Sequence, residues 1–172
     1  MSKAHLSQRT ATGYHEAGHA VVCHRLGFQV NRVTIVPSAT FAGQCSHENI
    51  LRRINPEFDN TDRGRMRMEK TIMVCLAGQI AQCMWRARSV RSYHSHADFK
   101  LASDLSLRVN GTGPTATAYL EWLTLRTREI IKSSWPVVEA LATDLLQQGT
   151  ITVKKTTIDQ TPIRERLQFF WR

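Results

Sequence analysis

Residues 15–19 are His15-Glu16-Ala17-Gly18-His19, and the interpretation of the whole chain starts from this stretch. It lies in a segment, residues 8–26, whose apolar spacing predicts a helix, with Ser7 as its N-cap and Gly27 as its C-terminal stop. Residues four apart on a helix lie on the same face, one turn from each other. The two histidines can therefore direct their imidazoles at a single cation.

Glu16 follows the first histidine and flanks the same face of the predicted helix. Zinc lowers the pKa of a bound water to about 7, and a nearby carboxylate can then take its proton as general base. These are the mechanics of the H-E-x-x-H motif, which predicts a zinc metalloendopeptidase with catalytic Glu16 and the ligands His15 and His19. The alternative is that the two histidines are ordinary helix residues and Glu16 is a surface charge. Three functional residues at the required spacing disfavour this alternative.

Gly18 within this motif is unusual, because a glycine inside a helix costs about 1 kcal/mol relative to alanine. Close approach of another backbone would account for it. A catalytic zinc also needs a third protein ligand. His24 lies about 180° round the helix from His15 and cannot join the site. The metzincin extension fails as well, because Val22 and Arg25 stand where it requires glycine and histidine.

A predicted helix over residues 96–109 offers the third ligand, Asp98. At about 100° per residue, this aspartate is centred in the apolar stripe of the helix. A carboxylate directed into a core needs a partner, and a zinc ion is one. A capping or first-turn carboxylate is a competing interpretation of Asp98, whereas Asp104 falls on the opposite, solvated face. The stripe around Asp98 comprises Leu101, Ala102, Leu105 and Val109.

The remaining pattern predicts a mainly α fold with a small β element, as one domain over residues 1–172. A β-branched run predicts a strand over 28–37, and residues 44–47 are a candidate partner strand. Residues 33–36 of the first strand are expected to bind an extended substrate by edge addition. Further predicted elements are helices over 61–88, 96–109, 115–133 and 136–148, an extended segment over 151–157 and a helix from 158.

Composition argues against a membrane protein and against a secreted one. No stretch approaches the roughly 20 apolar residues of a membrane span, and residues 1–5 lack the apolar core of a signal peptide, so we expect a cytoplasmic protein.

The net charge of +9 permits binding to nucleic acid, but the arginines are scattered and match no nucleic-acid fold signature. A solvated basic surface is favoured. Cys23, Cys45, Cys75 and Cys83 lack C-x-x-C spacing and are expected to be free thiols.

Several segments together resemble the peptidase domain of the FtsH family, the M41 metalloproteases normally fused to an AAA+ ATPase. The resemblance runs from His15 to about Ile158 and implies that Asp98 supplies the third zinc ligand, as the helical wheel also indicates. It implies unfolded proteins or peptides as substrates. The matching segments are residues 15–22, the strand 31–37, the Gly-containing helix 76–81, the segment 98–103 and the C-terminal helix 139–146.

The chain also departs from the family pattern. Residues 94–97 are His94-Ser95-His96-Ala97, where the family has small residues, and these histidines could alter access to the metal. The 172 residues contain no G-x-x-x-x-G-K-[ST] loop and no transmembrane anchor. An alternative is therefore a protease-like subunit, or an inactive interaction module, working in trans with a separate AAA+ ATPase. Neither the substrate, the oligomeric state nor the identity of the divalent metal follows from the sequence.

Overall fold

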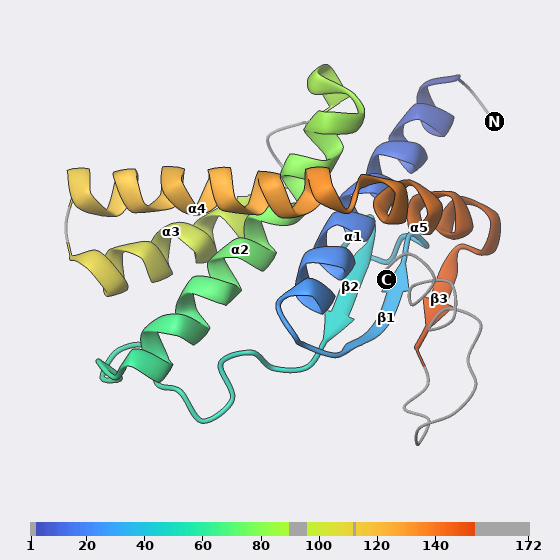
Figure 1. Cartoon of the computed structure of the whole chain (residues 1–172). Coiled ribbons are helices and arrows are strands. Elements are labelled where there is room, and N and C mark those ends of the chain that lie inside the picture. The colour runs from blue at the N-terminus through green and yellow to red at the C-terminus, as the bar shows by residue number, and fades with distance from the viewer. Residues whose placement is uncertain (1–2, 90–95, 112, 154–172) are drawn as a thin grey trace.

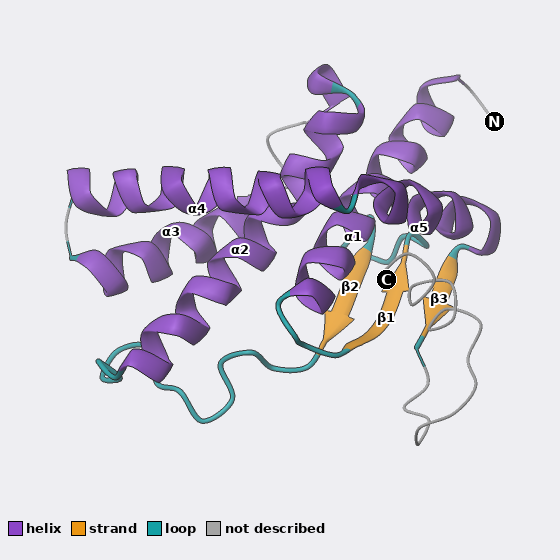
Figure 2. Cartoon of the chain, in the orientation of Figure 1, coloured by secondary structure: helices purple, strands orange, loops and turns teal. Residues whose placement is uncertain are grey.

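The computed structural model describes residues 3–89, 96–111 and 113–153. Helices dominate this part of the chain, and a small sheet lies to one side of them (Figures 1 and 2). The predicted mainly α fold with a small β element is confirmed. In chain order the elements are α1 (Lys3–Arg25), β1 (Val30–Thr34), β2 (Gln44–His47), α2 (Asp62–Trp85), the 3₁₀ turn η1 (Ala87–Ser89), α3 (His96–Asn110), α4 (Pro114–Ser133), α5 (Trp135–Gln148) and β3 (Thr150–Thr152).

Helices α1 and α2 pack against each other at the centre of the fold. A Cβ atom at Gly18 would lie 2.6 Å from the carbonyl oxygen of Ala77 and 2.6 Å from the Cβ of Ala81. Gly18 therefore lets the two backbones approach, as its position inside a helix predicts. Ala17, Val21 and Val22 of α1 are buried, and Ala17 and Val22 are fully so.

Of the two predicted ends of α1, only the C-terminal one is confirmed. Gly27 has φ +85°, and the N–H groups of Gly27 and Phe28 donate to the carbonyls of His24 and Cys23, which closes the helix with a Schellman motif. At the other end the helix begins at Lys3, so Ser7 lies inside it and the prediction of Ser7 as N-cap is wrong. No glycine or proline in residues 3–7 stops the helix from extending past Ser7.

The sheet has the order β2-β1-β3, and both pairings are antiparallel. Val33 in the middle strand pairs with Cys45 of β2 on one side and Ile151 of β3 on the other. The prediction that residues 33–36 bind substrate by edge addition is wrong, because β1 has a neighbour on each side and ends at Thr34. Within the described residues, the outer edge nearest the histidine motif belongs to β2.

Helices α3 and α4 lie side by side and cover α2, while α5 packs on α1 (Figure 1). This places the first turn of α3 near the middle of α1. The core lies between these helices and the inner face of the sheet, and its largest fully buried apolar side chains are Val22, Val33, Ile72, Leu123, Ile131, Val138 and Leu145.

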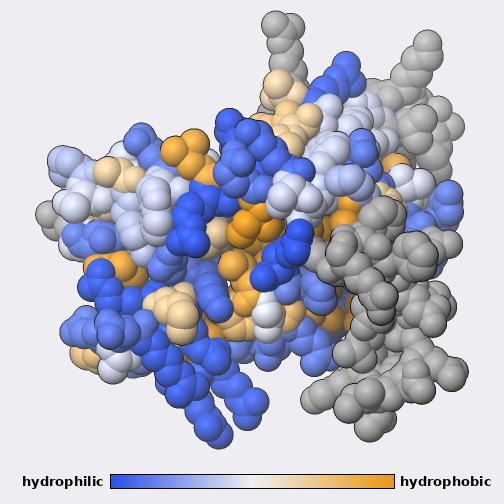
Figure 3. All heavy atoms as spheres, viewed as in Figure 1, coloured by the Kyte–Doolittle hydropathy of each residue, from blue (hydrophilic) through white to orange (hydrophobic). Residues whose placement is uncertain are grey.

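Hydrophilic side chains cover most of the face seen in Figure 3, and hydrophobic ones gather in small areas. Leu101, at the edge of the predicted apolar stripe of α3, is 43% exposed and lines a cleft together with Asp98, whereas Ala102, Leu105 and Val109 are buried. The 60° offset of Leu101 from Asp98 is enough to turn it out of the helix contact. None of the described helices is long and apolar enough to cross a membrane. The predicted helix from 158 lies outside the described residues.

Candidate metal centre

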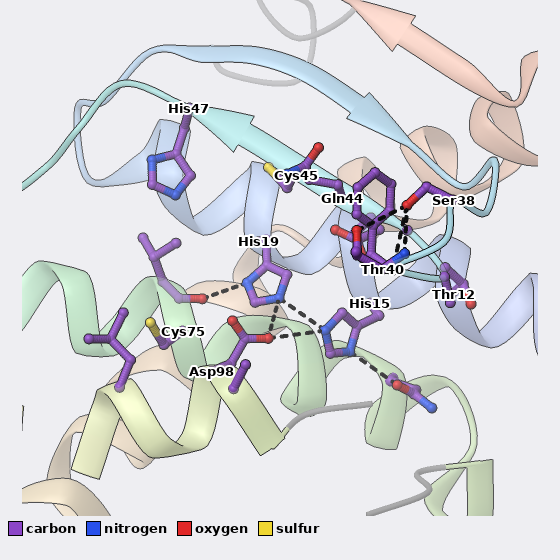
Figure 4. Close-up of a pocket in the computed structure, with 18 of the residues that line it drawn as sticks. Thr12, His15, His19, Ser38, Thr40, Gln44, Cys45, His47, Cys75 and Asp98 are labelled. Atoms are coloured by element: carbon purple, nitrogen blue, oxygen red, sulfur yellow. Dashed lines mark hydrogen bonds and ion pairs between the residues drawn. The ribbon is translucent and has the colours of Figure 1, made fainter. Parts of the chain in front are cut away.

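Three potential ligand side chains converge between α1 and α3 (Figure 4). The Oδ2 atom of Asp98 lies 3.5 Å from Nε2 of His15 and 3.3 Å from Nε2 of His19. The two Nε2 atoms are 3.0 Å apart. Both histidines are 7% exposed, and the Asp98 side chain is 36% exposed, so it forms the more open side of the group. The structure thus brings together the three residues predicted as ligands.

Helices α1 and α3 position the three ligand side chains, and α2 leaves space for them. One turn of α1 separates the two histidines, and Asp98 stands in the first turn of α3. Helix α2 passes behind them at Gly78, where a Cβ atom would lie 2.6 Å from Nε2 of His15 and would overlap Nε2 of His19. Only a residue without a side chain leaves that space to the imidazoles. Asp98 is a first-turn carboxylate, as the competing interpretation proposed, and it also faces the histidines.

The second nitrogen of each histidine is held by α2. Nδ1 of His19 lies 2.7 Å from the carbonyl oxygen of Val74, which can only accept, so this nitrogen carries the proton. Nδ1 of His15 lies 3.1 Å from Oε1 of Gln82. When both imidazoles are neutral and their Nδ1 atoms carry the protons, both Nε2 atoms present lone pairs to each other and to the carboxylate of Asp98. A cation placed among these three acceptors satisfies all of them.

The electrostatics of the group favour a positive charge at the same place. Burial alone would lower the pKa of His19, but the hydrogen bond and negative charge of Asp98, together with Glu16 and the Val74 carbonyl, outweigh it and raise the pKa to about 9. Burial would raise the pKa of Asp98, yet the two histidines hold it well below its usual range. Two imidazoles and one carboxylate form a donor set that suits a divalent transition metal, zinc included.

Glu16 is almost completely buried beside the group, at 6% exposure. Its carboxylate accepts a hydrogen bond from the backbone N–H of Cys45 on β2 and lies against Gly43, where a Cβ atom would be 2.9 Å from Oε1. Burial raises its pKa, and the charge of Asp98 adds to this, while His19, His15 and the Cys45 N–H act against it. A carboxyl group with a raised pKa is better matched to proton transfer near neutral pH.

These residues line a cleft of about 830 Å³ between α1, α2, α3 and β2. Residues 37–43 of the loop that joins β1 to β2 border the cleft at the end nearer to His15, and Figure 4 shows Ser38 and Thr40 there. Cys45 and His47 lie on the strand above the histidines, and Cys75 lies beside Asp98 (Figure 4). All four cysteines are free thiols, as predicted, but the sequence did not indicate that two of them line the cleft.

The structure leaves other candidate residues out of the group. His24 is exposed on the far side of α1, and Asp104 pairs with Lys100 at 2.7 Å on the solvated face of α3. His96 is exposed, and His94 lies outside the described residues. Sequence reasoning missed Gln82 and the contact of Gly78 with the imidazoles. The signals for Gly78 were its position inside a predicted helix and its place in the segment 76–81 that resembles the family.

Comparison with known proteins identifies the family. Residues 3–109, more than half of the chain, match the model of peptidase family M41. The chain belongs to peptidase family M41. The resemblance inferred from residues 15–22, 31–37 and 76–81 is thereby confirmed, and these segments together with Asp98 all lie within the matched region.

Two curated relatives of this family are similar over the same part of the chain. Each is an "ATP-dependent zinc metalloprotease FtsH", one from Rickettsia conorii (strain ATCC VR-613 / Malish 7) and one from Rickettsia prowazekii (strain Madrid E). Each is 28% identical over 102 residues, which cover 58% of this chain and 15% of the relative. The chain therefore corresponds to a small part of the length of these relatives.

Proposed function

We propose that this member of the M41 family is a zinc-dependent metalloendopeptidase that hydrolyses peptide bonds in unfolded proteins or peptides. The observation that carries the proposal is the convergence of His15, His19 and Asp98 at 3.0–3.5 Å in a cleft that also holds buried Glu16. The names of the two relatives support zinc as the metal.

In this proposal His15, His19 and Asp98 hold the zinc, and Glu16 is the general base. Zinc, when bound, supplies a water molecule whose pKa is lowered to about 7. The Glu16 carboxylate would accept a proton from the water as the water oxygen attacks the peptide carbonyl carbon. The C–N bond then breaks, and Glu16 returns the proton to the leaving amine. The burial of Glu16 and the hydrogen bond from Cys45 hold its carboxylate in one place for both transfers.

Strand β2, rather than β1, is the element we propose for substrate binding. Its inner side pairs with β1, and its residues Gln44, Cys45 and His47 line the cleft. An extended peptide can add to the outer side of a strand through main-chain hydrogen bonds, whatever its side chains are. This mode of binding suits unfolded chains, because most backbone hydrogen-bonding groups of a folded protein are already paired within it.

Replacement of Glu16 by glutamine tests the mechanism. The amide keeps the size of the side chain but cannot accept a proton, so we expect hydrolysis of an unfolded casein-like protein to fall by at least about 100-fold. The variant should still bind one zinc per chain, because Glu16 is not among the ligands. Glu57→Gln, at an exposed ion pair with Arg108, is the matched control and should keep full activity. Retained hydrolysis in Glu16→Gln would exclude this mechanism.

A second candidate function is a protease subunit that depends on a separate AAA+ ATPase. It is favoured by the name of the relatives, which are ATP-dependent, and by the small part of their length, 15%, that this chain matches. Cleavage of unfolded casein by the purified chain without ATP would count against this candidate. Cleavage that appears only when a co-purifying AAA+ protein and ATP are added would support it.

A further inference from the structure

Gln82 lies on α2, 67 residues from His15 in the chain, yet its side chain contacts the Nδ1 atom of His15, the ring nitrogen that does not face Asp98. It is 3% exposed. Its Oε1 atom lies 3.1 Å from Nδ1 of His15, and its Nε2 atom lies 2.9 Å from the carbonyl oxygen of Ser89. Both polar atoms of the amide therefore have partners inside the protein.

These two contacts leave one arrangement of protons. The Ser89 carbonyl can only accept a hydrogen bond, so the NH₂ group of Gln82 must face it. The amide oxygen then faces His15, and an amide oxygen can only accept. Nδ1 of His15 must therefore be the protonated nitrogen, and Nε2 carries the lone pair directed at His19 and Asp98. A backbone carbonyl at Ser89 thus determines, through Gln82, which nitrogen of His15 is available to a metal.

His19 is held differently. Its Nδ1–H donates directly to the backbone carbonyl of Val74, so its tautomer is determined by the helix itself. His15 depends on a side chain, and that side chain is tied to the segment that follows α2. The hydroxyl of Ser89 shares its one proton between the backbone carbonyl of Arg86 at 2.7 Å and that of Gln82 at 3.2 Å, which holds the η1 turn against the end of α2.

We propose that Gln82 is a positioning residue, which keeps His15 in the Nδ1–H tautomer so that its Nε2 can bind the metal. This inference rests on the proposed function for the identity of the metal as zinc, but its test does not use catalysis. Hydrogen-bond partners of ligating histidines typically change metal affinity by roughly 10- to 100-fold when they are removed.

Three variants separate positioning from structural support. Gln82→Leu removes both hydrogen bonds at similar size. Gln82→Glu keeps an acceptor for His15 and loses the donor to Ser89. Gln79→Leu is the control, because Gln79 is half-buried on the same helix and does not line the cleft. Zinc affinity is measured by competition with a chromophoric chelator, and folding is followed by circular dichroism.

We expect Gln82→Leu to bind zinc roughly 10- to 100-fold more weakly than the wild type. Gln82→Glu should bind at least as tightly as the wild type, although it melts at a lower temperature because the Ser89 carbonyl is left unpaired. Gln79→Leu should bind like the wild type.

Wild-type affinity in a folded Gln82→Leu would overturn the inference. If Gln82→Leu does not fold, Gln82→Glu decides: tight binding supports positioning, and binding weakened by 10-fold or more overturns it. A wild-type chain that binds no zinc would overturn the proposed function together with this inference, whereas zinc binding that is indifferent to Gln82 would overturn this inference alone.

Discussion

Gly78 on α2 lies so close to His19 on α1 that a Cβ atom at position 78 would overlap the Nε2 atom of the imidazole. The imidazole has little freedom to move, because it is buried and its Nδ1–H is held by the Val74 carbonyl. The backbone of α2 therefore forms the rear wall of the metal centre, and a methyl group on that wall would compete for space with both histidines.

The first prediction is that Gly78→Ala disrupts the metal centre while the fold remains. Alanine is favoured over glycine in a helix by about 1 kcal/mol, which offsets part of the strain. Displacement of the two Nε2 atoms should weaken zinc binding by roughly 10- to 100-fold, the range seen when ligand orientation is disturbed. Chelator competition measures the affinity, and wild-type zinc affinity would contradict the prediction.

Gly18→Ala is the matched control for Gly78→Ala. Its Cβ atom would meet the backbone oxygen of Ala77 and the Cβ of Ala81, which belong to the contact between α1 and α2 and not to the ligands. We expect a loss of about 1–3 kcal/mol in the free energy of unfolding, as for an overpacked contact. Urea unfolding measures this loss. A variant as stable as the wild type would show that the two helices can separate at little cost.

The second prediction distinguishes two aspartates on α3. Asp98→Ala removes a ligand in our proposal, so zinc binding and hydrolysis should both be lost. Asp104→Ala removes only an exposed ion pair with Lys100 and should change stability by less than about 1 kcal/mol, with zinc binding intact. Metal content after dialysis, measured by atomic absorption, compares the two. Equal zinc content in both variants would remove Asp98 from the ligand set.

The third prediction concerns removal of the metal. The apolar core between the helices and the sheet does not depend on the ligands, so the chain should keep its helical circular dichroism after chelation. Zinc at 100 times its Kd should add about 2.7 kcal/mol of stability. For a chain of this size that corresponds to a rise in Tm of roughly 5–10 °C. A Tm that does not respond to zinc would contradict a native metal centre.

The fourth prediction concerns the thiols. Burial, with a contribution from Glu48, raises the pKa of Cys23 to about 12, and burial with Asp98 raises the pKa of Cys75 to about 12 as well. Because only the thiolate reacts, both should resist iodoacetamide at pH 8 in the folded protein. Cys83 is half-buried, and Arg128 partly offsets the rise in its pKa, so it should react first.

Peptide mass spectrometry follows the order of alkylation, with urea-unfolded protein as the control in which all four thiols react. Alkylation should accelerate as the pH rises, because a larger fraction of each thiol is ionised. Alkylation of Cys23 as fast as that of Cys83 in the folded state would contradict the burial of Cys23 between α1 and the sheet.

Local patterns predicted much of this fold correctly. The positions of α2, α3, α4 and α5 follow from apolar spacing, and Gly27 and Gly149 both have positive φ at the ends of helices, where a side chain would be strained. The errors occur where local signals are weak. Ser7 resembles an N-cap, but nothing before it breaks the helix. The sequence predicted extended segments over 44–47 and 151–157, but no local signal showed that the second would pair with the free side of β1.

The sequence by itself determined the histidine pair and Glu16, because their spacing is a property of a single helix and needs no knowledge of the rest of the chain. It also singled out Asp98, since an acidic residue centred in an apolar stripe is visible on a helical wheel. Only the tertiary structure decided what surrounds them: the proximity of Asp98 to Nε2 of both histidines, the contact of Gly78 with the imidazoles and the hydrogen bond of Gln82 to His15. These relations join residues more than 50 positions apart, and they depend on how α1, α2 and α3 pack, which no local pattern encodes.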